Sequence, residues 1–128
     1  MESETKKYRN RAEGLLGDQA KLEKLVDEGM IKAEQQKERL KGFFYDLKAL
    51  FRLIRAYAKG DYRATPWKSL VAAVTAVVYF IYPLDFIPDF LLPGFLDDAL
   101  VVGWVLSSIK KDLSIFLHWE QLKASHEI

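Results

Sequence analysis

Two apolar segments joined by an acidic, proline-rich connection constrain the fold of this chain more than any other feature. Between Lys68 and Lys110 the sequence contains no Lys or Arg. The only acids in that interval lie in or beside the connection: Asp85, Asp89, Asp97 and Asp98. Segments that are apolar on every side are buried in protein or in lipid. We therefore expect the rest of the chain to be arranged around this pair of segments.

Local signals predict that the first apolar segment is a helix. Thr65 can accept a free backbone amide, and Pro66 has the fixed φ angle that suits the first helical position. The helix should run from Pro66 to about Tyr82, because Pro83 cannot continue it. Thr75 and two Tyr hydroxyls are its only polar groups after Leu70.

The connection and the second apolar helix are predicted in the same way. The turn-forming residues are those with restricted or permissive backbones: Pro83, Pro88, Pro93 and Gly94. Asp97 is the expected N-cap of a second apolar helix that ends at about Leu117. From Trp119 onward we expect a polar, frayed tail.

A third segment has the periodicity of an amphipathic helix. Its apolar residues recur in alternating steps of three and four: Leu40, Phe43, Leu47, Leu50, Ile54 and Tyr57. Gly60 is the expected C-terminal stop, since glycine adopts a left-handed cap without steric cost. Burial of apolar area contributes about 25 cal/mol per Å². Packing this helix over the two apolar segments is therefore favourable.

These patterns predict an all-α protein of about four helices, in which a central apolar helical hairpin is covered by the amphipathic helix. Residues 1–30 are expected to form a polar helical extension, and residues 31–128 the helical domain. A chain of 128 residues suffices for one domain, and it contains no cysteine for disulfides or Cys-ligated zinc. No secretory signal is visible at its amino terminus.

The connection also carries a recognisable motif. Its elements are a Tyr, then Pro-x-Asp, Ile-Pro-Asp and Gly-x-x-Asp-Asp: Tyr82, Pro83, Asp85, Ile87, Pro88, Asp89, Gly94, Asp97 and Asp98. By these residues the segment 67–109 resembles the YkvA-like family, a bacterial family of unknown function. Pro93 departs from the bulky residue more usual before the glycine. The resemblance implies a compact helical module of a kind often predicted to associate with membranes, and it implies no established reaction.

The four acids of the connection have two interpretations. Carboxylate oxygens are the ligands that Mg²⁺ and Ca²⁺ prefer, so acids converging at a hairpin tip predict a divalent-cation site. Alternatively each acid caps a helix or turn, or lies in a first helical turn where negative charge is favourable. The second interpretation is favoured, because Asp is the expected residue at such positions.

No motif indicates catalysis. The spacing of the acids differs from that of an EF-hand loop, and the chain has neither a Gly-rich phosphate loop nor a His-Glu-x-x-His motif. His118 and His126 are better explained as solvated or packed side chains than as ligands. We therefore favour a non-enzymatic role, without a firmly assigned cofactor.

The apolar segments are too short to span a bilayer. They cover residues 69–82 and 99–109, whereas a spanning helix needs about 20 residues. A hairpin would bring Lys68, Lys110 and Lys111 together at its open end, with Trp67 and Trp104 among the interfacial anchors. Full insertion would carry the carboxylates toward hydrocarbon, at a few kcal/mol for each central charge. Peripheral contact is therefore favoured over insertion.

The distribution of charge along the chain argues against nucleic acid as a partner. Residues 1–63 contain 15 Lys or Arg against 11 Asp or Glu, and residues 64–128 contain 4 against 7. Basic residues this interleaved with acids do not indicate nucleic-acid binding.

Together these patterns predict a cytoplasmic interaction module that acts at a membrane surface, peripherally or partly inserted, or on a protein partner. Uncovered apolar surface would also permit homo-oligomers, and a regulatory or hydrolytic cation-binding domain is the alternative.

Overall fold

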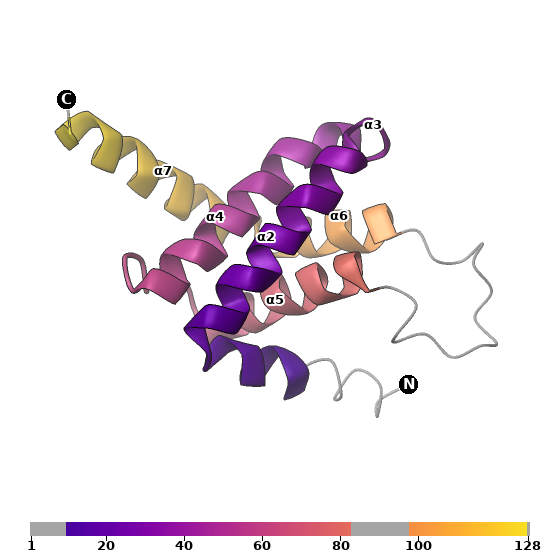
Figure 1. Cartoon of the computed structure of the whole chain (residues 1–128). Coiled ribbons are helices and arrows are strands. Elements are labelled where there is room, and N and C mark those ends of the chain that lie inside the picture. Colours follow the sequence, from indigo (N-terminus) through magenta and orange to yellow (C-terminus); the bar gives the residue numbers. More distant parts are fainter. Residues whose placement is uncertain (1–9, 83–97, 128) are drawn as a thin grey trace.

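A computed structural model describes residues 10–82 and 98–127, and within them helices and turns are the only regular structure (Figure 1). Residues 10–16 are helical. The elements that follow are α2 (Gln19–Gln35), α3 (Lys37–Leu40), the 3₁₀ helix η1 (Lys41–Phe43), α4 (Phe44–Lys59), α5 (Trp67–Ile81), α6 (Asp98–Ser108) and α7 (Lys110–Glu127). The all-α fold class is confirmed, but this part of the chain holds more helices than the four or so that were predicted.

The amino-terminal region, predicted as a polar helical extension over residues 1–30, is divided in its described part. Residues 10–16 end at a turn, and Asp18 then caps α2 by accepting a hydrogen bond from the backbone amide of Lys21 at 3.1 Å. A side chain that satisfies a free amide in this way favours a new helix start. Helix α2 continues across residue 30 and packs against α4 and α5.

Gly29 lies in the middle of α2 rather than at its end. A Cβ atom placed there would be 2.7 Å from Cε1 of Phe51, whose ring is fully buried in α4. The absence of a side chain at Gly29 therefore allows α2 and α4 to approach each other closely.

The amphipathic helix forms where its periodicity predicts only from Phe44 onward: Leu40 lies in α3, and Phe43, which was expected on the buried face, lies in η1 and is 37% exposed. Helix α4 buries an apolar face that includes Leu47, Leu50 and Ile54. Gly60 is its left-handed C-cap, with φ of 81°, and the Gly60 amide donates to the carbonyl of Tyr57 at 3.0 Å. The expected stop at Gly60 is therefore confirmed.

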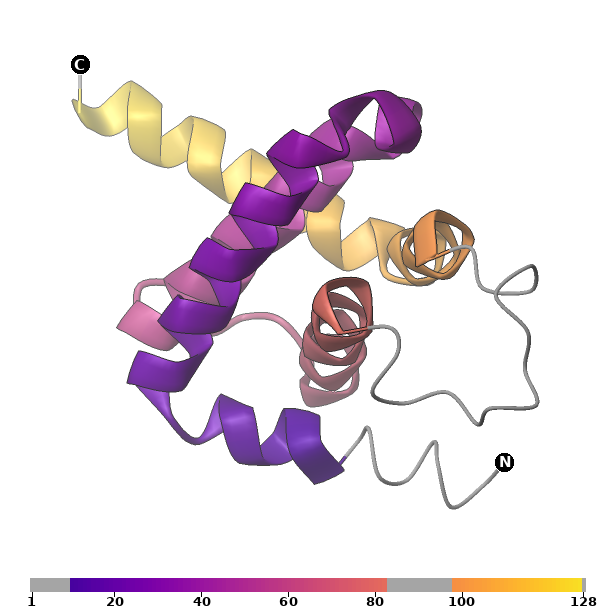
Figure 2. The same ribbon diagram turned by 45° about the vertical axis from the view of Figure 1, so that its right-hand side comes forward.

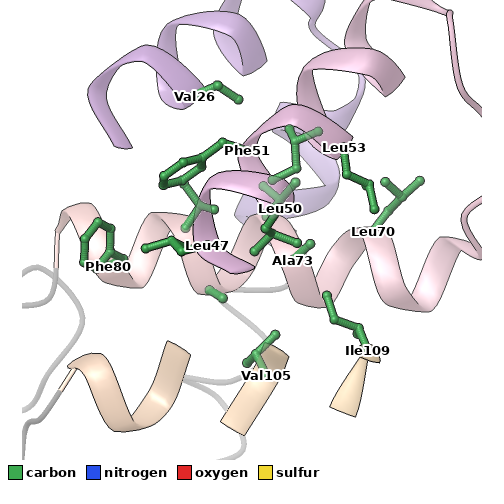
Figure 3. Close-up of a cluster of buried hydrophobic side chains, with 14 of the residues drawn as sticks. Val26, Leu47, Leu50, Phe51, Leu53, Leu70, Ala73, Phe80, Val105 and Ile109 are labelled. Carbon is green, nitrogen blue, oxygen red and sulfur yellow. The ribbon is translucent and has the colours of Figure 1, made fainter. Parts of the chain in front are cut away.

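Helix α5 is the buried centre of the fold. It contacts α2, α4 and α6, and Figure 3 shows its Leu70, Ala73 and Phe80 among core side chains from the surrounding helices. The predicted end near Tyr82 is confirmed, because α5 ends at Ile81. The expectation that Thr65 caps its start is wrong: Pro66, with ψ of 146°, is the N-cap, and no side chain donates or accepts there.

Helices α5 and α6 pack against each other, and the end of α5 lies on the same side of the molecule as the start of α6 (Figures 1 and 2). Helix α4 also contacts both of them. The residues that join α5 to α6, 83–97, lie outside the described part of the chain, and with them the predicted turn.

The carboxyl-terminal prediction needs two corrections. The second apolar segment was expected to form one helix to about Leu117, but α6 ends at Ser108 and α7 begins at Lys110. The tail was expected to fray from Trp119, but α7 continues to Glu127. Trp119 is half-buried, because its indole packs on the rings of Tyr62 and Phe116 with centroids 4.9 and 5.7 Å away. These contacts hold the start of the predicted tail on the core, whereas residues 121–125 are exposed.

Candidate interaction surface

The predicted cation site falls almost entirely outside the described residues. Three of its acids, Asp85, Asp89 and Asp97, lie there, as do the turn-forming residues Pro83, Pro88, Pro93 and Gly94. Asp98 opens α6, but its side chain is not described. Elsewhere in the described part, no three acidic or histidine side chains are grouped so that they could hold a metal ion. Both interpretations of the acids therefore stay predictions.

The first turns of α5 and α7 lie side by side and carry the basic residues expected at one end of the fold. Ser69, in the first turn of α5, donates a hydrogen bond from Oγ to a carboxylate oxygen of Asp112, in the first turn of α7. Next to these bonded residues are exposed side chains that we call the lysine end: Trp67, Lys68, Lys110 and Lys111. Trp67 is 51% exposed, although it is a large apolar side chain.

Trp104 is the most exposed large apolar side chain in the described residues, at 73%. Its neighbour Gly103 lies against the ring of Phe43, since a Cβ at Gly103 would be 2.6 Å from Cζ of that ring. Gly103, Phe43 and Lys110 line a shallow groove of about 230 Å³ between η1 and the α6–α7 junction. Lys110 of the lysine end therefore lines the same groove as Gly103, the residue before Trp104.

Polar contacts between α2 and the end of α5 were not anticipated from sequence. The Lys32 ammonium donates to the carbonyl of Phe80 and lies 5.0 Å from the centroid of that ring. Tyr82 donates from its hydroxyl to a carboxylate oxygen of Glu28. Burial, and then the nearby charge of Arg39, lower the pKa of Lys32 from its usual value. Helix α2 therefore fixes the end of α5 at the point where the proline-rich connection begins.

Tyr62, like Lys32, has a shifted pKa. Its phenol is buried against Phe116 and Trp119, and burial, followed by the negative charge of Asp112, raises its pKa. Sequence reasoning missed this aromatic cluster because Tyr62 lies more than 50 residues before its two partners, Phe116 and Trp119. The helical spacing of Phe116 and Trp119, three residues apart, was the one available signal.

Fold and surface together define the class of this protein: a small all-α protein with exposed Trp and Lys side chains around a buried apolar helix. Comparison with known proteins gives the family. A family model described as a protein of unknown function (DUF1232) matches residues 69–104. The uncharacterized membrane protein YkvA of Bacillus subtilis (strain 168) is 36% identical over 89 residues, which cover 69% of this chain and 84% of that protein. The chain belongs to the YkvA-like family.

No solved structure matches the chain significantly. Among the described helices, none combines the length and the apolar character required to cross a bilayer.

Proposed function

We propose that this protein is a non-enzymatic helical module that binds the surface of a membrane through the lysine end and Trp104. The observation that carries the proposal is the grouping of Trp67, Lys68, Lys110 and Lys111 at the adjoining first turns of α5 and α7. Tryptophan side chains favour the boundary between lipid and water, where the ring is partly apolar and partly hydrogen-bonded. A Trp exposed beside lysines therefore suits a lipid surface better than bulk water.

The lysines supply the attraction to anionic lipid. Each Lys close to an anionic leaflet contributes about 1 kcal/mol, an effect that decreases with salt. Lys68, Lys110 and Lys111 together would contribute about 3 kcal/mol on that scale. The Bacillus relative is described as a membrane protein, which also supports this location.

We also infer that the connection closes α5 and α6 into the predicted helical hairpin, beneath α4. The contacts of α5 with α6, and of α4 with both helices, support this arrangement. In the sequence the acids of the connection follow the end of α5, whereas Trp67 begins that helix. Binding through the lysine end would keep those carboxylates out of hydrocarbon, where each charge costs a few kcal/mol.

Two other functions are retained as alternatives. A protein partner could use the same surface, and a divalent cation could be held by the acids of the connection. No described contact favours either alternative over a lipid surface. Both give different results in the experiments below.

Vesicle flotation tests the proposal. The protein should float with vesicles that contain phosphatidylglycerol and less with vesicles of phosphatidylcholine alone. The triple variant Lys68→Gln, Lys110→Gln and Lys111→Gln should bind anionic vesicles at least about tenfold more weakly.

The matched control neutralises three exposed lysines on α2 and α3: Lys21→Gln, Lys24→Gln and Lys37→Gln. Equal losses in the two triple variants would show that only net charge matters. No flotation with any lipid would overturn the proposal and favour a protein partner.

A further inference from the structure

A second groove lies between the carboxyl-terminal halves of α4 and α7. Figure 1 shows these ends of the two helices on its left side. The volume of the groove is about 430 Å³, and it is shallow and open to solvent. The charged side chains that line it are Arg52, Arg55, Lys59, Asp61, Glu120 and Lys123. Four cations thus face two carboxylates, although the whole chain has a net charge of only +1.

The groove has a fixed aromatic floor. Trp119 lines it and stacks on Phe116, with an interplanar angle of 28°. Tyr62 packs against both rings. Because Phe116 and Tyr62 are buried, the indole has little freedom to turn.

One wall is fixed by ion pairs. Arg52 donates from Nε and Nη2 to the two carboxylate oxygens of Glu120, at 2.9 and 3.2 Å, and so joins α4 to α7. Arg55 pairs with Asp27 of α2. These contacts largely neutralise both guanidinium groups and hold them in place.

The two lysines of the groove, Lys59 and Lys123, differ from these arginines in having no carboxylate partner among the described residues. In the described part of the chain neither Lys59 nor Lys123 forms an ion pair with a carboxylate, and both are exposed. The Lys123 ammonium lies 5.2 Å from the centroid of the Trp119 ring, above the floor. Asp61 is the remaining carboxylate of the lining, so the mouth of the groove keeps an excess of positive charge.

We propose that this groove binds a small phosphorylated anion, held by the ammonium groups of Lys59 and Lys123, the second of which lies over the ring of Trp119. Phosphate oxygens accept strong charge-assisted hydrogen bonds from Lys and Arg. The ion pairs of Arg52 and Arg55 hold the walls of the groove in position for this contact. The anion is either a phosphate ester in solution or the phosphomonoester headgroup of a lipid. The inference is independent of the lysine end, which uses other residues.

Tryptophan fluorescence provides a direct test, because Trp119 is one of three tryptophans and the other two are exposed. The variant Trp67→Phe with Trp104→Phe leaves Trp119 as the sole reporter. Titration with inorganic phosphate and with glycerol 3-phosphate, at constant ionic strength, should change its emission with saturation. Adding Lys59→Gln and Lys123→Gln should raise the Kd about tenfold or more, since both charge-assisted contacts are lost.

The control adds Lys21→Gln and Lys24→Gln, which remove the same charge from α2. Circular dichroism confirms that each variant is folded. Saturation by glycerol 3-phosphate supports a soluble ester. Saturation only by vesicles that contain phosphatidic acid, and not phosphatidylglycerol, supports a lipid headgroup. No saturable change with any of these probes, or equal weakening by both pairs of substitutions, would overturn the proposal. Because the phosphate titration contains no lipid, its result is separate from that of vesicle flotation.

Discussion

Gly29→Ala should destabilise this protein, although alanine is the better helix former. In an unobstructed helix interior, replacing Gly by Ala gains about 1 kcal/mol. At Gly29 the new methyl group would lie 2.7 and 2.8 Å from two carbons of the Phe51 ring. Phe51 has no exposed surface, so its ring cannot move into solvent. Overpacking of this kind costs about 1–3 kcal/mol, which leaves a net loss of about 1 kcal/mol.

Gly14 is the matched control, because it is also helical but an added Cβ meets nothing within 4 Å. Gly14→Ala should therefore leave the protein as stable or up to about 1 kcal/mol more stable. Urea unfolding of both variants measures the difference, with an unchanged slope as the sign that compactness is preserved.

A third variant isolates the cause. Phe51→Leu in the Gly29→Ala background should relieve the contact, so the two substitutions should be coupled in a double-mutant cycle by about 1 kcal/mol or more. The reasoning is refuted if Gly29→Ala stabilises the protein as much as Gly14→Ala, or if the cycle shows no coupling.

Three further predictions concern the aromatic cluster, the tail and the connection. Because the folded pKa of Tyr62 is raised above the unfolded value of 10.0, its contribution to stability is complete below that pH and is lost as the pH rises through the folded pKa. Tyr62→Phe should remove that alkaline decline in Tm, and an unchanged decline would assign it to another group. Trp119→Ala should lower the free energy of unfolding by about 2 kcal/mol, because Trp119 is a half-buried aromatic. Leu122→Ala should lower it by less than about 0.5 kcal/mol, because Leu122 is 49% exposed. Equally small losses in both variants would show that Trp119 is not packed on the core. If the acids of the connection hold a cation, Tm should rise with Mg²⁺, Ca²⁺ or Mn²⁺ and lose that response in Asp89→Asn or Asp97→Asn, and a flat response in the wild type would exclude the site.

Features with a local cause could be predicted from sequence. The end of α5 follows from Pro83, and the cap at Gly60 follows from the ability of glycine to adopt positive φ. The apolar character of α5 likewise predicts its place at the centre of the core. These signals need no knowledge of what lies beside them in space.

Features that depend on distant partners could not be predicted in this way. From sequence alone Gly29 suggests an interruption of the helix, because glycine is a poor helix former. Its role in the close approach of α2 to Phe51 appears only in the structure. The packing of the tail could not be predicted, because its partners lie far away in the sequence. Trp119 packs on Tyr62, and Glu120 pairs with Arg52, 68 residues away. The second groove exists only because these contacts bring α7 onto α4.

For the candidate interaction surface, too, the contact that brings its residues together could not be predicted from sequence. The surface predicted from sequence, which stays a prediction, consists of residues in or beside the apolar segments: Trp67, Lys68, Trp104, Lys110 and Lys111. The contact between Ser69 and Asp112, which places the first turns of α5 and α7 side by side, carries no sequence signal. Two polar residues 43 positions apart are paired only by the packing of the helices around them.

The emission spectrum of Trp67 tests the central claim most directly. In a variant with Trp104→Phe and Trp119→Phe, Trp67 is the sole tryptophan and reports contact between the lysine end and lipid. We predict that its emission shifts to shorter wavelength with vesicles containing phosphatidylglycerol, and that the triple substitution of Lys68, Lys110 and Lys111 by Gln abolishes the shift. An emission spectrum that stays unchanged with anionic vesicles would contradict binding through this surface.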